Sequence, residues 1–117
     1  MRILVIDDEL DTAQTVALLL RNEGHEVRYA VTAGAALDLV KDNEPQLVIL
    51  DLGLPDMDGL ELARRLKRRD KGTAPKIIAI TGRGAETRVA ALKAGCDHFL
   101  QKPVDPGVLY SLIDDPH

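Results

Sequence analysis

The segment "LVILDLGLPDMDG" (residues 47–59) opens with four consecutive apolar residues and then places an aspartate, Asp51, directly before a stretch with two glycines and a proline. An uninterrupted apolar run of this length is typical of a strand that is covered on both faces of a parallel sheet. Glycine, proline and aspartate are common in turns. The segment therefore predicts a buried strand that carries a carboxylate to the point where the chain turns.

The rest of the chain alternates between short strands and helices. Apolar or alternating runs predict strands at 3–6, 26–30, 46–50, 76–80 and 98–101. Apolar residues that recur three and four positions apart predict helices over 13–20, 33–40, 62–66, 85–94 and 108–113. Thr32 is suited to cap the second helix, and Gly24 and Gly95 are suited to end the first and the fourth.

Five successive β-α units indicate a parallel sheet with helices on both faces. Right-handed crossovers leave few arrangements of such strands, and the common one for five strands is flavodoxin-like, in the order 2-1-3-4-5. We therefore predict an α/β, flavodoxin-like (βα)₅ doubly wound fold. A length of 117 residues suits one domain, so we expect residues 1–117 to form a single domain.

Composition narrows the class of protein. The formal net charge is −4, which argues against broad nucleic-acid binding, since that needs a basic surface. The basic cluster at 64–71 is best read as the solvated face of a helix, with partner docking as the alternative. The one cysteine, Cys96, excludes an internal disulfide, and no apolar run is long enough to span a membrane. We therefore expect a cytoplasmic protein that binds neither nucleic acid nor a membrane.

Chemically active side chains come directly after four of the five predicted strands. They are Asp7-Asp8, Asp51, Thr81 and Lys102, in chain order. In open parallel sheets ligands bind outside the carboxyl ends of the strands, close to the point where the strand order reverses. We therefore expect these side chains to meet at one edge of the sheet.

Three carboxylates held close together repel one another, and a hard divalent cation relieves this repulsion. An all-oxygen set suits Mg²⁺, Mn²⁺ or Ca²⁺, and the sequence offers no thiolate or imidazole set for zinc. The lysine and the hydroxyl suit the remaining oxygens of a phosphoryl group. We infer phosphoryl transfer onto a carboxylate, with Asp51 as the nucleophile and Asp7-Asp8 as the cation site.

Four motifs together resemble the receiver domain of two-component response regulators over nearly the whole chain. They are "VIDDE" (5–9), "ILDLGLPDMDG" (49–59), "AITG" (79–82) and "KAGCDHFLQKPV" (93–104). The receivers of hybrid sensor kinases and stand-alone single-domain regulators are particularly similar. The resemblance implies a phosphorylation-controlled switch that takes its phosphoryl group from a histidine kinase or a histidine phosphotransfer protein, with no output domain in this chain.

The resemblance also implies roles for the residues at the predicted sheet edge. Asp51 would be the phosphoacceptor. Asp8 would bind Mg²⁺ directly, with Mn²⁺ as a substitute, and Asp7 would act mainly through a bound water. The backbone carbonyl of Gly53 would be a further metal ligand. Thr81 and Lys102 would each bind a phosphoryl oxygen.

A cis peptide bond between Lys102 and Pro103 and a conformational switch are implied as well. In the switch, Thr81 moves toward the phosphoryl group and Phe99 turns inward. The alternative role for Phe99 is that of a plain core aromatic. The downstream partner would bind the surface formed by the fourth helix, the fifth strand and the fifth helix.

Two positions are expected to set the lifetime of the phosphorylated form. Gly53 has no side chain where many relatives carry one, and Arg83 places a long cation two residues after Thr81. We hypothesise that Gly53 leaves the attacking water unhindered, while Arg83 partly shields the phosphoryl group.

Two other functions compete with the switch. A phosphatase with an aspartyl-phosphate intermediate would carry an acid two residues after the nucleophile, where this chain has Gly53. A flavodoxin-like cofactor carrier would need a phosphate-cradling loop, which the sequence lacks. We therefore expect a phosphoacceptor with slow autodephosphorylation, and not a turnover enzyme.

Overall fold

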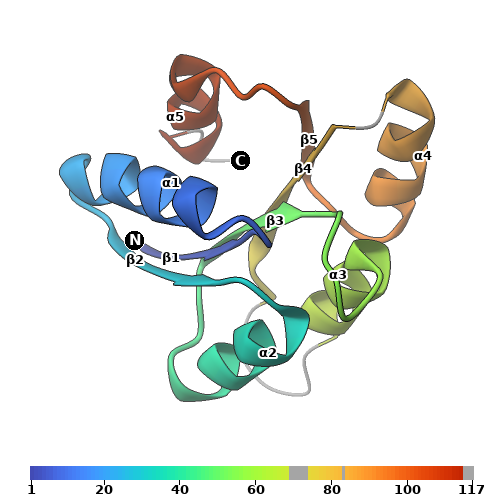
Figure 1. The fold of residues 1–117 in the computed structure, drawn as a ribbon, viewed down its shortest axis with the longest axis horizontal. Coiled ribbons are helices and arrows are strands. Elements are labelled where there is room, and N and C mark those ends of the chain that lie inside the picture. The colour runs from blue at the N-terminus through green and yellow to red at the C-terminus, as the bar shows by residue number, and fades with distance from the viewer. Residues whose placement is uncertain (69–73, 83, 115–117) are drawn as a thin grey trace.

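In the computed structural model, which describes residues 1–68, 74–82 and 84–114, five parallel strands form one sheet in the order β2-β1-β3-β4-β5 (Figure 1). The strands are β1 (Arg2–Ile6), β2 (Glu26–Ala30), β3 (Leu47–Asp51), β4 (Lys76–Thr81) and β5 (His98–Gln101). The helices are α1 (Leu10–Asn22), α2 (Ala33–Asp42), α3 (Gly59–Lys67), α4 (Ala85–Lys93) and α5 (Pro106–Asp114). The predicted flavodoxin-like fold and strand order are confirmed.

Strand β3 lies at the centre of this sheet, between β1 and β4. All five of its residues are buried, including the terminal Asp51. The register pairs Leu50 with Ile6 of β1 and with Ala79 of β4. The interpretation of residues 47–50 as a strand covered on both faces is therefore confirmed.

Side chains of the strands alternate between two hydrophobic cores, one on each face of the sheet. Helices α2, α3 and α4 cover one face, and α1 and α5 cover the other (Figure 1). The first core takes Leu4, Ile6, Val48, Leu50, Ile77 and Ala79 from the strands. The second takes Ile3, Val5, Leu47, Ile49, Ile78 and Ile80. Cys96 is buried at the margin of the first core, and burial raises the pKa of its thiol to about 11.

The helix ends follow the signals in the sequence. The Thr32 hydroxyl accepts the N–H of Ala35 and caps α2. Gly24 and Gly95 adopt positive φ angles of 93° and 104° just after α1 and α4. Helix α5 starts at Pro106, two residues before the predicted start, because the fixed φ of proline suits the first turn of a helix.

Helices α3 and α4 differ in the kind of side chain that they expose. Helix α3 pairs Arg64 and Arg65 with Glu61 on its exposed face, which agrees with a solvated surface for that part of the basic cluster; residues 69–71 of the cluster lie outside the described residues. Among the α4 side chains that the structure describes, Ala91 alone is buried, whereas Val89 and Leu92 are largely exposed.

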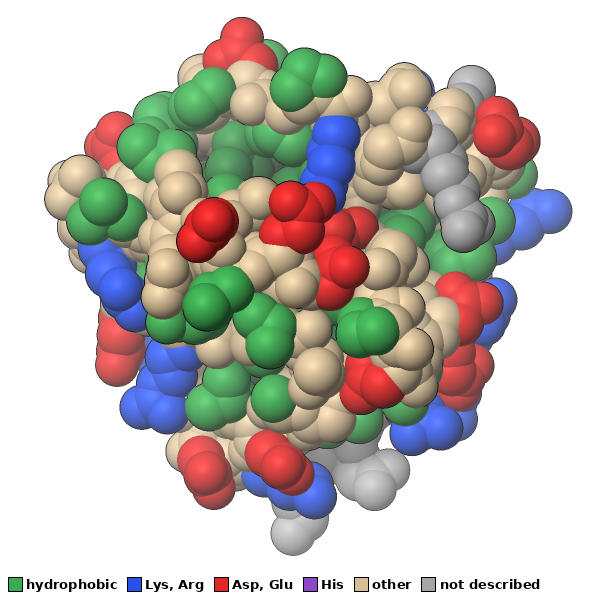
Figure 2. All heavy atoms as spheres, viewed as in Figure 1, with side chains coloured by type: hydrophobic (Ala, Val, Ile, Leu, Met, Phe, Trp, Pro, Cys, Tyr) green, Lys and Arg blue, Asp and Glu red, His purple; other side chains and the backbone are tan. Residues whose placement is uncertain are grey.

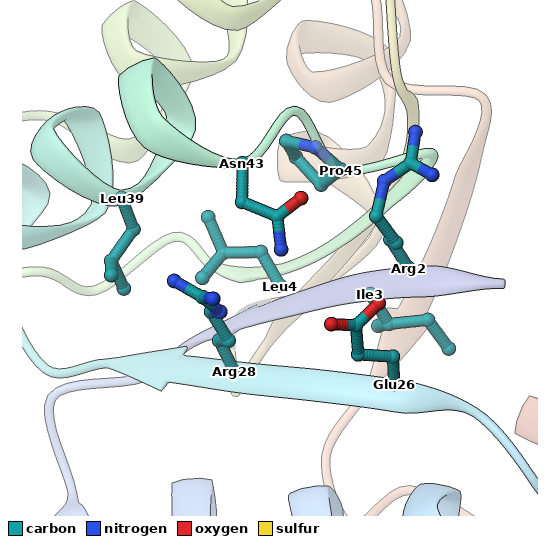
Figure 3. A pocket seen from close by; sticks show the side chains of 8 residues that line it. All are labelled: Arg2, Ile3, Leu4, Glu26, Arg28, Leu39, Asn43 and Pro45. Atoms are coloured by element: carbon teal, nitrogen blue, oxygen red, sulfur yellow. The ribbon is translucent and has the colours of Figure 1, made fainter.

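A small pocket lies under α2, beside β1 and β2. Figure 3 shows Leu4 and Arg28 on the side of the pocket that faces Leu39 and Asn43, while Arg2 extends past Pro45. Its volume of about 10 Å³ holds about one water molecule. Among the described residues, no helix has the length and apolar character to cross a membrane.

Gly59, the first residue of α3, lies against the backbone of Leu52. A Cβ at Gly59 would come within 2.6 Å of Leu52 Cα, a distance that requires the backbone to shift. We expect Gly59→Ala to lower the free energy of unfolding by about 1–3 kcal/mol, the usual cost of overpacking. Gly34→Ala in the first turn of α2 is the matched control, because its nearest contact would be an ordinary 3.6 Å.

Urea unfolding followed by circular dichroism measures both variants. Equal stability of Gly59→Ala and wild type would contradict the close packing of α3 on Leu52.

Candidate functional site

Three carboxylates meet at the carboxyl edge of the sheet. Asp7 and Asp8 follow β1, and Asp51 ends the adjacent strand β3. One carboxylate oxygen from each of the three lies within 4.8 Å of the others. Asp7 and Asp51 are buried and Asp8 is exposed, so the cluster opens to solvent on one side. The structure thus brings together the acidic residues that the strand ends predict.

The Asp51 carboxylate is held by two donors. Its Oδ1 accepts the backbone N–H of Gly53 at 2.9 Å, and its Oδ2 accepts a hydrogen bond from Lys102 Nζ at 2.9 Å. Gly53 belongs to the turn that follows β3, and Lys102 follows β5. The nucleophile predicted from the sequence is therefore fixed from two sides of the sheet edge.

Lys102 bridges two of the carboxylates. Its Nζ lies 3.6 Å from Asp7 Oδ2 in addition to its contact with Asp51. Burial lowers the pKa of Lys102, but the hydrogen bond and charge of Asp51 outweigh this effect and raise it overall. The backbone N–H of Lys102 donates to the carbonyl of Thr81 at 2.8 Å, and the Lys102-Pro103 peptide bond is cis.

Within this cluster, Asp7 is a carboxyl group that is hard to ionise. Burial raises its pKa to about 6; the charge of Asp51 adds to the rise, while the Glu9 backbone N–H at 2.9 Å and Lys102 oppose it. A buried carboxylate that resists ionisation beside two others is well suited to a divalent cation. The all-oxygen donor set of Asp7, Asp8 and Asp51 fits Mg²⁺ or Mn²⁺.

The remaining predicted residues take different places. Thr81 is buried at the end of β4, one position beyond the residue that pairs with Asp51, so it reaches the same edge. Phe99 lies on β5 opposite Ala79 and packs, partly buried, against the first core. Arg83 lies outside the described residues.

Comparison with known proteins agrees with this geometry. The family model for the response regulator receiver domain matches residues 3–114. The chain belongs to this family. It is 40% identical over 114 residues to an uncharacterized 14.6 kDa protein of Leptolyngbya boryana, covering 97% of this chain and 87% of that protein. The CheY-like receiver domain protein of Methanospirillum hungatei JF-1 has a crystal structure that matches with a TM-score of 0.87 and 36% identity, over 96% of this receiver and 89% of that chain.

Several relatives of this receiver are longer proteins. The chain is 36% identical over 112 residues to the phosphate regulon transcriptional regulatory protein PhoB of Pseudomonas aeruginosa, and 39% identical over 104 residues to the response regulator MprA of Mycobacterium sp. (strain KMS). These matches cover 95% and 88% of the receiver but only 49% and 44% of the relatives. The likeness therefore extends to about half of each of these proteins.

A hollow beside the acidic cluster was not predicted from the sequence. It lies between α1 and α5 with a volume of about 560 Å³, and it reaches Asp7, Asp51 and Lys102. Figure 2 shows a recess with a hydrophobic floor next to acidic side chains on this face. Its apolar lining comes from Val5, Ile6, Val16, Leu19, Ile49, Ile80, Pro103, Val104, Pro106 and Leu109. The sequence signal that could have indicated this hollow was Val104, a small residue directly after Lys102-Pro103.

The raised pKa of Asp7 predicts how stability depends on pH. Because its folded pKa of about 6 lies above the ordinary 3.8, the folded receiver binds more protons between these values, and stability falls as pH rises through that window. In EDTA, Asp7→Asn should therefore be more stable than wild type above the window, by on the order of 3 kcal/mol, and equally stable below it.

Urea unfolding across this pH range measures the effect. Asp38→Asn is the control, because it removes the same charge from an exposed position on α2. A constant difference between Asp7→Asn and wild type at all pH values would contradict the raised pKa.

Proposed function

We propose that this receiver is a phosphorylation-activated switch that accepts a phosphoryl group on Asp51 from a histidine kinase or a histidine phosphotransfer protein. The observation that carries the proposal is the Asp51 carboxylate itself. It is buried at the end of a rigid strand, held at 2.9 Å by both Gly53 and Lys102, and placed beside two further carboxylates. This arrangement presents one oriented nucleophile to a phosphoryl donor.

In the proposed step, a carboxylate oxygen of Asp51 attacks the phosphorus of a phosphohistidine. A P–O bond forms as the P–N bond breaks, and the electron pair stays on the leaving imidazole nitrogen, which takes up a proton. The ammonium of Lys102 and the hydroxyl of Thr81 would bind phosphoryl oxygens as charge develops on them. The site needs little other chemistry, because phosphoryl transfer depends mainly on position and electrostatics.

A Mg²⁺ ion is part of the proposal, with Mn²⁺ as a substitute. Asp8 and Asp51 would bind it directly, Asp7 would act mainly through a water molecule, and the carbonyl of Gly53 would be a further ligand. When bound, the ion neutralises charge on the phosphoryl oxygens. Its role in this chain is supported by the clustered carboxylates and by the raised pKa of Asp7.

The hollow between α1 and α5 suggests where the phosphodonor docks. Its apolar floor adjoins Asp51 and Lys102, so apolar side chains of a partner that fill it would lie next to the nucleophile. The proposed route by which the signal leaves is the face of α4, β5 and α5. Val89, Leu92 and Val108 expose apolar surface on those two helices, and Thr81 and Phe99 would link this face to Asp51.

We propose further that residues 1–117 act as one receiver domain whose partners are proteins. The net charge of −4 supports protein partners over nucleic acid for this part. PhoB is named as a transcriptional regulatory protein, and the receiver matches 49% of its length.

Labelling with a small phosphodonor tests the central proposal. With Mg²⁺ and acetyl phosphate, or with beryllofluoride, intact mass spectrometry should find one adduct on wild type and none on Asp51→Asn. The label should be stoichiometric, without the steady release of phosphate that a phosphatase gives. No adduct on wild type would refute the proposal, and an adduct on both proteins would move the site away from Asp51.

The lifetime of the phosphorylated form tests the role of Gly53. An added Cβ there would lie 3.5 Å from Asp51 Oδ1, an ordinary contact, so a side chain fits beside the phosphoryl group. We expect Gly53→Asn to lengthen the lifetime by about tenfold, because it hinders the attacking water. Arg83→Ala should shorten it if Arg83 shields the group. Identical lifetimes in a dephosphorylation assay of all three proteins would rule the hypothesis out.

A further inference from the structure

The loop that follows Asp51 is tied to a helix from a distant part of the chain. The side chain of Asp56, in the loop 52–58, reaches the first turn of α2. Asp56 Oδ1 accepts the backbone N–H of Ala33 at 2.9 Å, and Oδ2 accepts that of Gly34 at 3.1 Å. One carboxylate therefore binds the first two amides of a helix that lies more than twenty residues earlier in the chain.

Two properties of a helix start favour this contact, although the Asp56 side chain is exposed. The first amides of a helix have no partner within the helix, and the helix dipole favours negative charge at this end. Hydrogen bonds from Ala33 and Gly34 lower the pKa of Asp56, so the carboxylate is ionised at neutral pH. Helix α2 already has a local cap, since Thr32 accepts the N–H of Ala35 at 3.1 Å.

The loop is anchored at both of its ends by other contacts. At the start, the N–H of Leu52 donates to the carbonyl of Ile80 at 3.0 Å. At the end, Asp58 accepts the N–H of Leu60 and caps α3. Between these anchors, Gly53, Pro55 and Asp56 are exposed. Leu54 and Met57 pack, partly buried, against the first core, and the bond from Asp56 adds a polar tie between the middle of the loop and α2.

The restrained segment matters because it begins with Gly53. The Gly53 N–H donates to Asp51 Oδ1, and the Gly53 carbonyl is the proposed metal ligand. We propose that Asp56 is a positioning residue, which clamps the loop 52–58 onto the first turn of α2 and so holds Gly53 in place for Mg²⁺ binding. This inference rests on the proposed function, which assigns Mg²⁺ to the site.

A competing explanation is that Asp56 only stabilises α2. Thr32 separates the two explanations, because it caps the same helix end but makes no such bond to the loop. Thr32→Ala should weaken the start of α2 without releasing the loop. Asp56→Ala should do both, and Asp56→Asn should fall between, because an amide keeps a single acceptor oxygen for the two N–H groups.

Nuclear magnetic resonance of the full chain measures both consequences. We expect Asp56→Ala to speed amide hydrogen exchange of Gly53 and its neighbours about tenfold, and Thr32→Ala to leave it unchanged. A Mg²⁺ titration followed by amide shifts should show an affinity about tenfold weaker for Asp56→Ala, the usual cost of losing a group that orients a metal ligand. The Thr32→Ala affinity should match wild type.

Several outcomes would overturn the clamp. They are unchanged loop exchange in Asp56→Ala, unchanged Mg²⁺ affinity in that variant, or equal weakening in Thr32→Ala. If Asp56→Ala fails to fold, Asp56→Asn carries the same comparison. A wild type that binds no Mg²⁺ would contradict the proposed function, while the exchange rates would still decide whether Asp56 holds the loop.

Discussion

The burial of a carboxylate at the end of an apolar strand is the constraint on which the site depends. A buried charge without partners is costly, and the structure meets that cost at Asp51 with a backbone amide and an ammonium. Both donors are available because β3 is central and because the turn and the end of β5 reach the same edge. The strand order 2-1-3-4-5 also places Asp7 and Asp8 next to Asp51, directly after the neighbouring strand β1. The strand order therefore determines which charged groups are paired at this edge of the sheet.

Much of this could be predicted from the sequence, because the signals are local. The run 47–50 has no polar alternation, which identifies a central parallel strand, and the side chain that follows each strand is fixed by adjacency in the chain. Once the parallel order is known, Asp7, Asp51 and Lys102 must share an edge. The helix signals at Thr32, Gly24 and Gly95 were equally local, and each appears in the structure as expected.

The features that could not be predicted arise from packing between distant segments. Asp56 lies in a turn-rich motif and reads as a turn residue, and its bond to α2 depends on how two β-α loops face each other. The hollow between α1 and α5 depends on how far apart those helices lie, which apolar periodicity does not specify. Helix α4 has no clear apolar stripe, so the period of its sequence does not specify which face packs on the sheet. The exposure of Val89 and Leu92 could therefore not be predicted.

The bridge that Lys102 makes between Asp7 and Asp51 has a further consequence for the order of binding. With all three carboxylates ionised, this edge carries three negative charges against one positive charge, so it repels an anionic phosphodonor and attracts cations over several ångströms. A divalent cation would cancel the excess. In the proposed switch, local electrostatics would therefore favour metal binding before the phosphodonor, because the ion would remove the repulsion that an anionic donor meets at this edge.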